Sequence, residues 1–285
     1  MYHKAYGIIE TQAPLHVGAT AGEETGNLNL IFRDQFTKTG IIPGSSIRGR
    51  FRADMRQENG NVDYWYGKEA PPTQLKSDNS KDTTENNTTE GIIKFEYASL
   101  VWIPVYCPNQ PVVRVSCPAL LKRYQKVTGK STKEFKPYSY FGKNCSKTLF
   151  FNLGFLKLKE EDTALENCIP PEVDDAKKHL LVVVGDTEIS MIHDMALYRQ
   201  SRVSLEQEKK KAKKGAFFDV EALPEGTVMV FPIAMRQMYD GNRVDWQQFL
   251  SAGKFSDEWK ELYFGGLESI GFGRTEVLLK AQASQ

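Results

Sequence analysis

The sequence predicts an α+β fold in a single domain spanning residues 1–285, with an antiparallel sheet and helices packed on a face. Short apolar runs of strand length alternate irregularly with amphipathic helical patterns. No segment recurs at a period of about 20–50 residues, so a repeat architecture is not expected. The chain of 285 residues also contains ample apolar material for one large core.

Strands are predicted where short runs are apolar or β-branched. Residues 2–10 have strand character, and residues 28–32 are short and apolar enough for a strand or an ordered loop. Further strands are expected at residues 92–105, 112–116, 150–158, 180–184, 228–233 and 275–279.

A helix is predicted to follow the turn at residues 43–44 and to run to about residue 56. Either Ser45 or Ser46 can serve as its N-cap. Apolar side chains then recur at helical spacing on one face: Ile47, Phe51 and Met55. Further helices are predicted at residues 119–127, 186–198 and 245–264, the last of them broken near Gly253.

Two polar segments interrupt the pattern. Residues 68–91 are rich in Ser, Thr, Asn, Asp, Pro and Lys, which indicates a flexible insertion. Residues 129–147 form a second, lysine-rich insertion dotted with aromatic residues. The charged run 206–214 is typical of a solvated loop or helix face. Its lysines, close to Phe217 and Phe218, would also suit a contact with nucleic acid.

The composition excludes several classes of protein. The net charge is only +1, so any nucleic-acid binding must come from local clusters of charge. No apolar segment is typical of a signal peptide or a membrane span, and we expect a cytoplasmic protein. Four cysteines at scattered spacings predict reduced, mostly buried thiols rather than a zinc site. They are Cys107, Cys117, Cys145 and Cys168.

Three arginines of the first helix follow one another at a spacing of four residues, on a face beside its apolar face. They are Arg48, Arg52 and Arg56. Proteins bind a sugar-phosphate backbone through hydrogen-bond donors and positive charges. Both are supplied here by the free N–H groups of the helix start, two serine hydroxyls and a column of guanidinium groups. These residues alone slightly favour an ordinary capped surface helix with solvated arginines.

The glycine-rich stretch 265–273 lacks the Lys-Ser/Thr pair of a phosphate-binding P-loop, and a strand follows it rather than a helix. A nucleotide site is therefore disfavoured. A loop that another chain or an RNA approaches closely is better motivated, with Arg274 supplying the charge.

The histidines show no spacing typical of metal ligands, and no Gly-x-Ser-x-Gly elbow is present for a serine nucleophile. His16 is kept as a candidate because it lies just before the loop that leads to the arginine-bearing helix. His3, His179 and His193 are expected to be structural or surface residues.

Taken together, these segments resemble the backbone subunits of type III CRISPR–Cas effector complexes, the repeat-associated RNA-binding (RAMP) superfamily. The resemblance is greatest to the filament-forming subunit of the Cmr-type (III-B) complex. The motifs that carry it are Leu15-His-Val-Gly18; Ile42-Pro-Gly-Ser-Ser-Ile-Arg-Gly49 with Arg52; Tyr66-Gly67; Leu100-Val-Trp-Ile-Pro-Val105; Val115-Ser-Cys-Pro118 with Leu121 and Arg123; Gly215-Ala-Phe-Phe218 with Glu221-Ala-Leu-Pro224; and Gly265-Gly-Leu-Glu-Ser-Ile-Gly-Phe-Gly-Arg274.

The resemblance implies a modified RNA-recognition-motif core, ferredoxin-like, shaped as a hand with a thumb hairpin within residues 202–221. Such subunits stack along a guide RNA, and each thumb displaces a base pair of the guide–target duplex. The implied partners are guide RNA, target RNA, copies of the chain and other type III subunits. The residues implied to contact RNA are Ser45, Ser46, Arg48, Arg52, Gly271, Gly273 and Arg274.

One departure from the family concerns cleavage. Target-cleaving members carry an aspartate whose place here is Leu28, or with a slip of one residue Asn27 or Asn29. None of these side chains can take up a proton or bind a divalent cation as a carboxylate does. The expectation is a binding and assembly subunit without cleavage and without a cofactor.

Two alternatives remain open. In the first, the chain is an endoribonuclease dependent on Mg²⁺ or a similar cation, with its acid displaced and His16 assisting. The candidate acids are Glu23, Glu24 and Asp34. In the second, it is an unrelated RNA-recognition-like protein that binds cellular RNA on its own.

Overall fold

The computed structural model describes residues 1–19, 28–58, 60–68, 88–108, 110–142, 146–152, 154–173, 179–205, 212–256 and 258–282. Within them, the largest sheet has ten strands in the order β16-β17-β1-β13-β5-β6-β10-β7, with β3 pairing β5 and β4 pairing β13. The pairs are antiparallel except β6 with β10. The strands are β1 (Tyr2–Thr11), β3 (Ile41–Ile42), β4 (Ile93–Phe95), β5 (Ala98–Cys107), β6 (Gln110–Ser116), β7 (Tyr140–Phe141), β10 (Leu180–Val183), β13 (Val228–Arg236), β16 (Lys260–Tyr263) and β17 (Arg274–Ala281).

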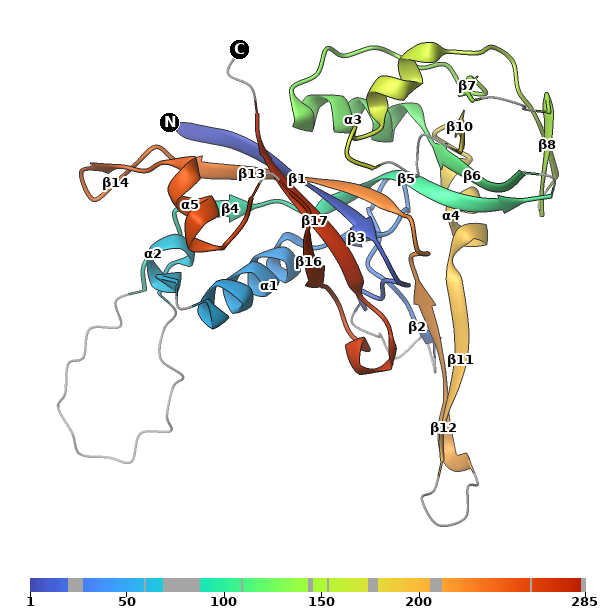
Figure 1. The fold of residues 1–285 in the computed structure, drawn as a ribbon. Coiled ribbons are helices and arrows are strands. Elements are labelled where there is room, and N and C mark those ends of the chain that lie inside the picture. Colours follow the sequence, from blue (N-terminus) through green and yellow to red (C-terminus); the bar gives the residue numbers. More distant parts are fainter. Residues whose placement is uncertain are drawn as a thin grey trace.

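Helices cover both faces of this sheet (Figure 1). They are α1 (Gly44–Gln57), α2 (Val62–Tyr66), α3 (Pro118–Thr128), α4 (Ile189–Ala196) and α5 (Trp246–Ala252), with 3-10 turns η2 (Thr163–Cys168) and η4 (Glu268–Ile270). The α+β fold expected from the sequence is thereby confirmed. None of the helices in the described ranges is long and apolar enough to cross a membrane.

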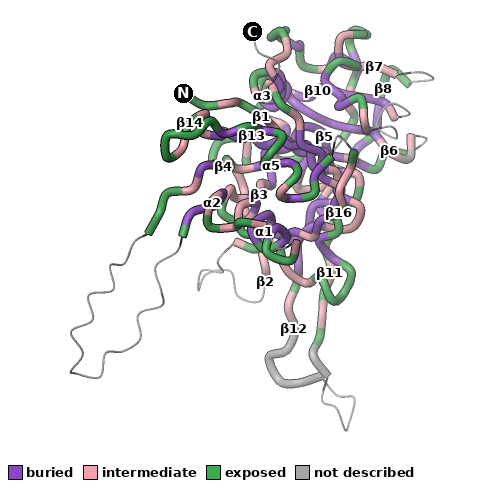
Figure 2. Tube along the Cα trace, turned by 60° about the vertical axis from the view of Figure 1, so that its left-hand side comes forward, coloured by how far each residue is buried: buried purple, intermediate pink, exposed green. Residues whose placement is uncertain are grey.

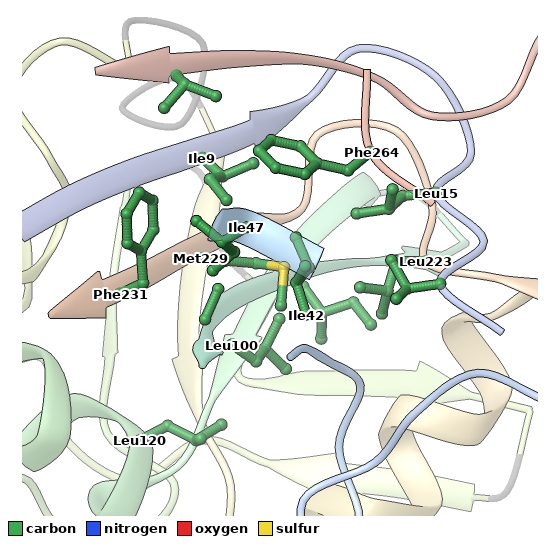
Figure 3. Packing of buried hydrophobic residues seen from close by; sticks show 14 of the residues in the cluster. Ile9, Leu15, Ile42, Ile47, Leu100, Leu120, Leu223, Met229, Phe231 and Phe264 are labelled. Atoms are coloured by element: carbon green, nitrogen blue, oxygen red, sulfur yellow. The ribbon is translucent and has the colours of Figure 1, made fainter. Parts of the chain in front are cut away.

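Alternation along the central strands divides the core into two clusters. Figure 2 shows that much of the central strands is buried. Ile9 and Phe231 point to the face covered by α1 and α5, whereas Ile8 and Val230 point to the face covered by α3. Because both faces are buried, the strands are almost continuously apolar. Figure 3 shows the packing of the first cluster, in which Ile47 of α1 lies among side chains of the sheet.

A two-stranded hairpin of β11 (Tyr198–Leu205) and β12 (Ala212–Ala222) extends away from the sheet (Figure 1). The short strand β2 (Leu28–Asn29) pairs with β12 in parallel. Two smaller hairpins complete the described structure. They are β8 (Thr148–Phe151) with β9 (Gly154–Lys157), and β14 (Met238–Tyr239) with β15 (Asn242–Arg243).

Three local expectations were wrong. The predicted helix 245–264 ends at Ala252, and its last part forms β16, because pairing with β17 outweighs the local helical pattern. The predicted strand 150–158 lies in a hairpin that turns before Gly154, which has a φ of +142° that favours glycine. The N-cap of α1 is Pro43 rather than Ser45 or Ser46, and no side chain caps the helix.

The two expected insertions have different outcomes. Most of the segment 68–91 lies outside the described residues. The described part of 129–147 is mostly exposed or half-buried, and it contacts the core at two places. Phe135 is buried in the α3-side cluster, and Tyr140–Phe141 pairs with β10. Its aromatic side chains supply the apolar area that its lysines lack.

Candidate nucleic-acid interface

The first turn of α1 lies at the surface. The N–H groups of Ser46 and Ile47 both donate to Pro43 O, at 3.0 and 3.1 Å. The N–H groups of Gly44 and Ser45 precede the first possible intrahelical acceptor, as in any helix start. The Ser45 side chain is exposed and Ser46 is half-buried. This turn therefore offers backbone donors and hydroxyl groups to an anion.

The three arginines of α1 have different surroundings. The Arg48 guanidinium is half-buried and donates to Tyr66 O at 2.6 Å. Arg52 is only 8% exposed, and its Nη2 lies 3.6 Å from Asp63 Oδ1 on α2. Arg56 is exposed. Arg48 and Arg52 thus both tie α1 to α2, with Arg48 left partly open to solvent, and Arg56 is the fully exposed member of the column expected from the spacing.

Small residues continue the exposed face of α1 after Ser45. A Cβ built at Gly49, one turn after Ser45, meets no atom within 4 Å. Ala53 continues this exposed face one turn later. A phosphate chain could approach the helix along this face without meeting a large side chain.

The glycine-rich loop packs against the segment that follows β1. Gly266 N donates to His16 O at 3.0 Å, and Gly273 N donates to Pro14 O at 2.9 Å. A Cβ at Gly265 would lie 2.1 Å from His16 O. Gly271 differs, since a Cβ there meets no atom within 4 Å. The glycines at 265 and 273 therefore serve close internal packing, and Gly271 lies at the open surface.

Arg274 follows this loop and is exposed. Its Nη2 donates to Gln12 O at 3.1 Å, and its Nη1 donates to Glu261 Oε2 at 3.5 Å. Exposed ion pairs of this kind contribute about 0–1 kcal/mol, so the guanidinium can exchange this partner for a phosphate at little cost.

Neighbouring chain segments link the glycine loop to α1. Gly266 binds His16, Phe32 N donates to Val17 O at 2.9 Å, and Ile41 N donates to Phe32 O at 2.9 Å. Ile41 begins β3, which leads directly into the start of α1. The predicted RNA-binding residues thus lie on one connected framework.

The base of the β11–β12 hairpin is held by His16. Its Nδ1 lies 2.6 Å from Glu221 O, and the imidazole is buried. Because a carbonyl only accepts, Nδ1 carries a proton and donates it to this oxygen. Glu221 itself is buried and binds the guanidinium groups of Arg33 and Arg199, at 3.0 and 3.2 Å.

Arg33 also binds Asp194 on α4, next to the fully buried His193. Gly40 N donates to His193 Nε2 at 2.9 Å, so the proton is on Nδ1, 3.6 Å from Asp194 Oδ1. Burial lowers the pKa of His193 below its ordinary value. The imidazole of His193, together with Arg33, lowers the pKa of Asp194 to about 2.

These two shifts predict loss of stability in acid. The unfolded chain takes up a proton on His193 near pH 6.5, whereas the folded protein resists it, so the free energy of unfolding should fall as the pH drops below about 6.5. The stabilisation from Asp194 is lost at lower pH, between about pH 4 and pH 2.

Urea unfolding between about pH 7.5 and pH 5 should show the decline that arises from His193. His193→Gln should flatten it, and His3→Gln, at the half-buried start of β1, should not. A flat profile for the natural protein would contradict this account.

The residues that the resemblance aligns with the family's aspartate include Leu28 and Asn29, which lie beside the hairpin. Leu28 is the register partner of Asp219 on β12, and Asn29 is the partner of Val220. Neighbouring residues in a parallel pair share a face, so an exposed carboxylate, Asp219, lies next to the leucine. Ser201 Oγ donates to Asp219 Oδ1 at 2.5 Å. Asp219 was not identified from the sequence, because the β2–β12 pairing joins segments far apart in the chain.

Of the three displaced acids considered, Asp34 has a structural role. Its Oδ1 accepts hydrogen bonds from Phe36 N and from Thr37 N and Oγ1, at 2.8–3.0 Å. Burial alone would raise the pKa of Asp34, but the bonds from Thr37 and Phe36 outweigh it and lower the pKa. Glu23, Glu24 and Asn27 lie outside the described residues. In the described ranges no group of three or more His, Cys, Asp or Glu side chains is placed to hold a metal ion.

Arg123 of α3 is a further cation near the start of α1. Its guanidinium lies over the Tyr97 ring, 4.2 Å from the centroid, and its Nε donates to Ser99 Oγ at 2.9 Å. Ser99 is the register partner of Ile41 in the β3–β5 pair. Arg123 belongs to the motifs quoted above, but its distance from α1 in the sequence concealed this neighbourhood.

Comparison of the sequence with known protein families gives a match over most of the chain. The RAMP superfamily matches residues 8–276, which include α1, the hairpin and the glycine loop. The chain belongs to the RAMP superfamily. A comparison with curated proteins finds no match.

Solved structures show the same fold over the whole chain. A chain of the type III-B Cmr-beta complex in its apo state is 19% identical, with a TM-score of 0.71 and 97% of both chains covered. A chain of Cmr-beta bound to cognate target RNA is 18% identical, with a TM-score of 0.70 and 98% of both chains covered. Oligomeric Cmr4 from Pyrococcus furiosus is 15% identical, with a TM-score of 0.67 and 99% of both chains covered. At 15–19% identity, the similarity of this RAMP chain to these structures establishes a shared fold.

Proposed function

We propose that this chain is a backbone subunit of a type III CRISPR effector complex in antiviral defence. It binds the sugar-phosphate backbone of the guide RNA, lines up with copies of itself or related subunits along that RNA, and shapes the guide–target duplex with the β11–β12 hairpin as its thumb. Family membership and the full-length likeness in fold to Cmr-beta and Cmr4 support the proposal. Specificity would come from base pairing, while the protein reads backbone shape and charge.

The observation that carries the proposal is the open start of α1. The first turn with its exposed Ser45, the small residue Gly49 and the half-buried Arg48 form a surface suited to consecutive phosphates. Ser45 and Ser46 supply hydroxyl groups there. Gly271 and Arg274 would contact the same backbone through the glycine loop, and the buried Gly273 would shape the loop between them. Arg52 would act mainly by holding α1 against Asp63.

Measuring the salt dependence of binding tests these assignments. Arg48→Ala in the full chain should weaken binding to guide RNAs of any sequence by roughly tenfold and reduce the slope of log affinity against log salt by about 1. Arg243→Ala, at an exposed arginine of the β14–β15 hairpin, is the matched control and should change neither. Thermal unfolding of Arg48→Ala and Arg52→Ala separates lost packing from lost charge, because Arg48 binds Tyr66 O and Arg52 lies against Asp63.

An unchanged slope in Arg48→Ala would remove that residue from the interface. Tight binding by the isolated monomer to RNA without guide sequence would instead favour an independent cellular RNA-binding protein. Formation of large particles only with guide RNA favours the proposed assembly.

We propose that the subunit does not cleave target RNA itself, because Leu28 and Asn29 occupy the family's aspartate position. The second candidate, cleavage with a displaced acid, is favoured by one observation, the exposed Asp219 next to Leu28. A carboxylate there could hold a divalent cation or accept a proton.

A cleavage assay distinguishes the two. The assembled complex is incubated with guide-complementary RNA and Mg²⁺, using natural protein and four single variants: Asp219→Asn, Asp34→Asn, Glu23→Ala and Glu24→Ala. Asp240→Asn, in the turn between β14 and β15, is the control. No cutting by natural protein beneath this subunit supports the scaffold function. Cutting that one of the four variants abolishes would establish the endoribonuclease.

A further inference from the structure

A small apolar cluster joins the glycine loop to the root of the hairpin, separate from the two main clusters. It contains Val220 and Ala222 of β12 and Phe272 of the loop, with Phe218 and Leu267 packed against it. Phe272 is only 3% exposed. The loop that we propose to lie along the RNA backbone is therefore anchored to the hairpin by a buried aromatic ring.

Two residues of β11 flank that ring. The Tyr198 ring lies 5.9 Å from the Phe272 ring, with an angle of 71° between their planes, so neither covers the other as a stacked ring would. The Arg202 guanidinium lies 5.5 Å from the centroid of Phe272, and its Nε donates to Gln200 Oε1 at 3.3 Å. Tyr198, Gln200 and Arg202 share one face of the strand, because side chains alternate with a period of two.

Tyr198 differs from Phe272 in its exposure. It is 40% exposed, although it is fixed by Phe272 and by pairing with Ala222 in the hairpin. An aromatic ring held in one orientation and open to solvent loses little entropy when a planar ligand stacks on it. Arg202 lies four residues further along the strand. Its guanidinium and the Tyr198 ring both lie within 6 Å of the Phe272 ring, so these two groups are less than 12 Å apart.

The combination suits an unpaired nucleobase. Proteins that read single-stranded RNA stack its bases on Tyr, Phe or Trp and contact the backbone through Arg. Every base has a π face, so such a site tolerates any sequence, as a guide-binding subunit requires. A base inside a duplex is covered by its neighbours and cannot use the ring. The site therefore selects a base that has left the helix.

We propose that Tyr198 is a stacking site for one unpaired base of the RNA held by this subunit, with Arg202 contacting a nearby phosphate. The inference rests on the proposed function, because the ligand is the RNA strand that runs past the loop 271–274. It goes beyond backbone recognition by assigning a base-contacting residue at the root of the hairpin.

Photo-crosslinking tests the stacking directly. Guide and complementary RNAs that carry 5-iodouridine at one position at a time are bound to the full chain, irradiated and mapped by mass spectrometry. We expect crosslinks to Tyr198 at a restricted set of positions. Tyr198→Ala should abolish them and weaken RNA binding roughly tenfold. Tyr198→Phe should keep both, because a phenyl ring stacks as well.

The salt dependence adds a second readout. Tyr198→Ala should leave the slope of log affinity against log salt unchanged, because a stacking contact releases no counterions, whereas Arg202→Gln should reduce it by about 1. Tyr106→Ala, at a tyrosine of β5 that is 69% exposed, is the matched control and should leave both crosslinks and affinity unchanged.

Several results would overturn the proposal. Crosslinks that persist in Tyr198→Ala, or that disappear equally in Tyr198→Phe, exclude stacking on this ring. If Tyr198→Ala changes only the size of the assembled particle, with crosslinks elsewhere unaltered, the surface binds another protein subunit instead. Failure of natural protein to bind guide RNA would refute the proposed function itself, and it is recognised in the same assay before any variant is compared.

Discussion

Phe51→Ala should destabilise the protein by about 3–5 kcal/mol, the range typical of deleting a fully buried aromatic side chain. Phe51 of α1 has no exposed surface. Its ring stacks on Phe255 at a centroid distance of 5.0 Å and lies 5.2 Å from Phe95. It also contacts the rings of Phe231 and Phe264, at 6.1 and 6.5 Å. The substitution would therefore leave a cavity bordered by four rings.

A loss of this size is a large share of the roughly 5–15 kcal/mol that separates a folded domain from its unfolded chain. Urea unfolding followed by circular dichroism measures it. Phe36→Ala makes the same chemical change at a residue that is 89% exposed, and it should alter the free energy of unfolding by no more than about 0.5 kcal/mol. Equal losses in the two variants would show that Phe51 does not anchor α1 as described.

Among substitutions of a loop glycine by alanine, Gly265→Ala should lower the stability of the protein most. Gly265 has a φ of +79°, a conformation that costs an alanine about 1–2 kcal/mol. The added Cβ would also lie 2.1 Å from His16 O, a backbone atom that cannot move independently. The loop must shift and weaken the hydrogen bond from Gly266 N to His16 O. We expect a loss of at least about 2 kcal/mol together with weaker binding of guide RNA.

The neighbouring glycine provides the control. Gly266 has no positive φ, and a Cβ built there meets no atom within 4 Å. Gly266→Ala should leave stability unchanged or raise it by about 0.4–1 kcal/mol, because alanine has fewer unfolded conformations. Thermal and urea unfolding of the two variants make the comparison. Similar behaviour of both would contradict the close packing of the loop against His16.

Local patterns predicted those elements whose surroundings are simple. The spacing of Ile47, Phe51 and Met55 identified α1, and all three side chains are buried. Apolar runs identified the strands of the central sheet, because strands covered on both faces are apolar throughout. The α+β class followed from the order of these elements.

Elements decided by distant pairing were missed. The chain 260–263 follows a helical pattern, yet it forms β16 because β17 offers it an antiparallel partner. The Asp219–Leu28 neighbourhood arises in the same way, from a parallel pair between segments almost two hundred residues apart. No local pattern encodes such pairings, since the register depends on where the rest of the chain places both strands.

For the predicted RNA-binding residues, the sequence showed their type but not their partners. The four-residue spacing placed Arg48, Arg52 and Arg56 on one side of α1. It could not show that Asp63 of the next helix holds Arg52. Their contacts with RNA stay predictions until the salt dependence of the variants is measured.

The attachment of the hairpin has a mechanical consequence. Three segments that lead toward α1 are fastened to β12: Leu28 through the parallel pair, His16 through Glu221 O, and Arg33 through the Glu221 carboxylate. A force on the hairpin is thus transmitted to the chain that begins α1 through a strand pairing, a hydrogen bond and an ion pair. The hairpin and the start of α1 are therefore held at a fixed separation by the protein itself.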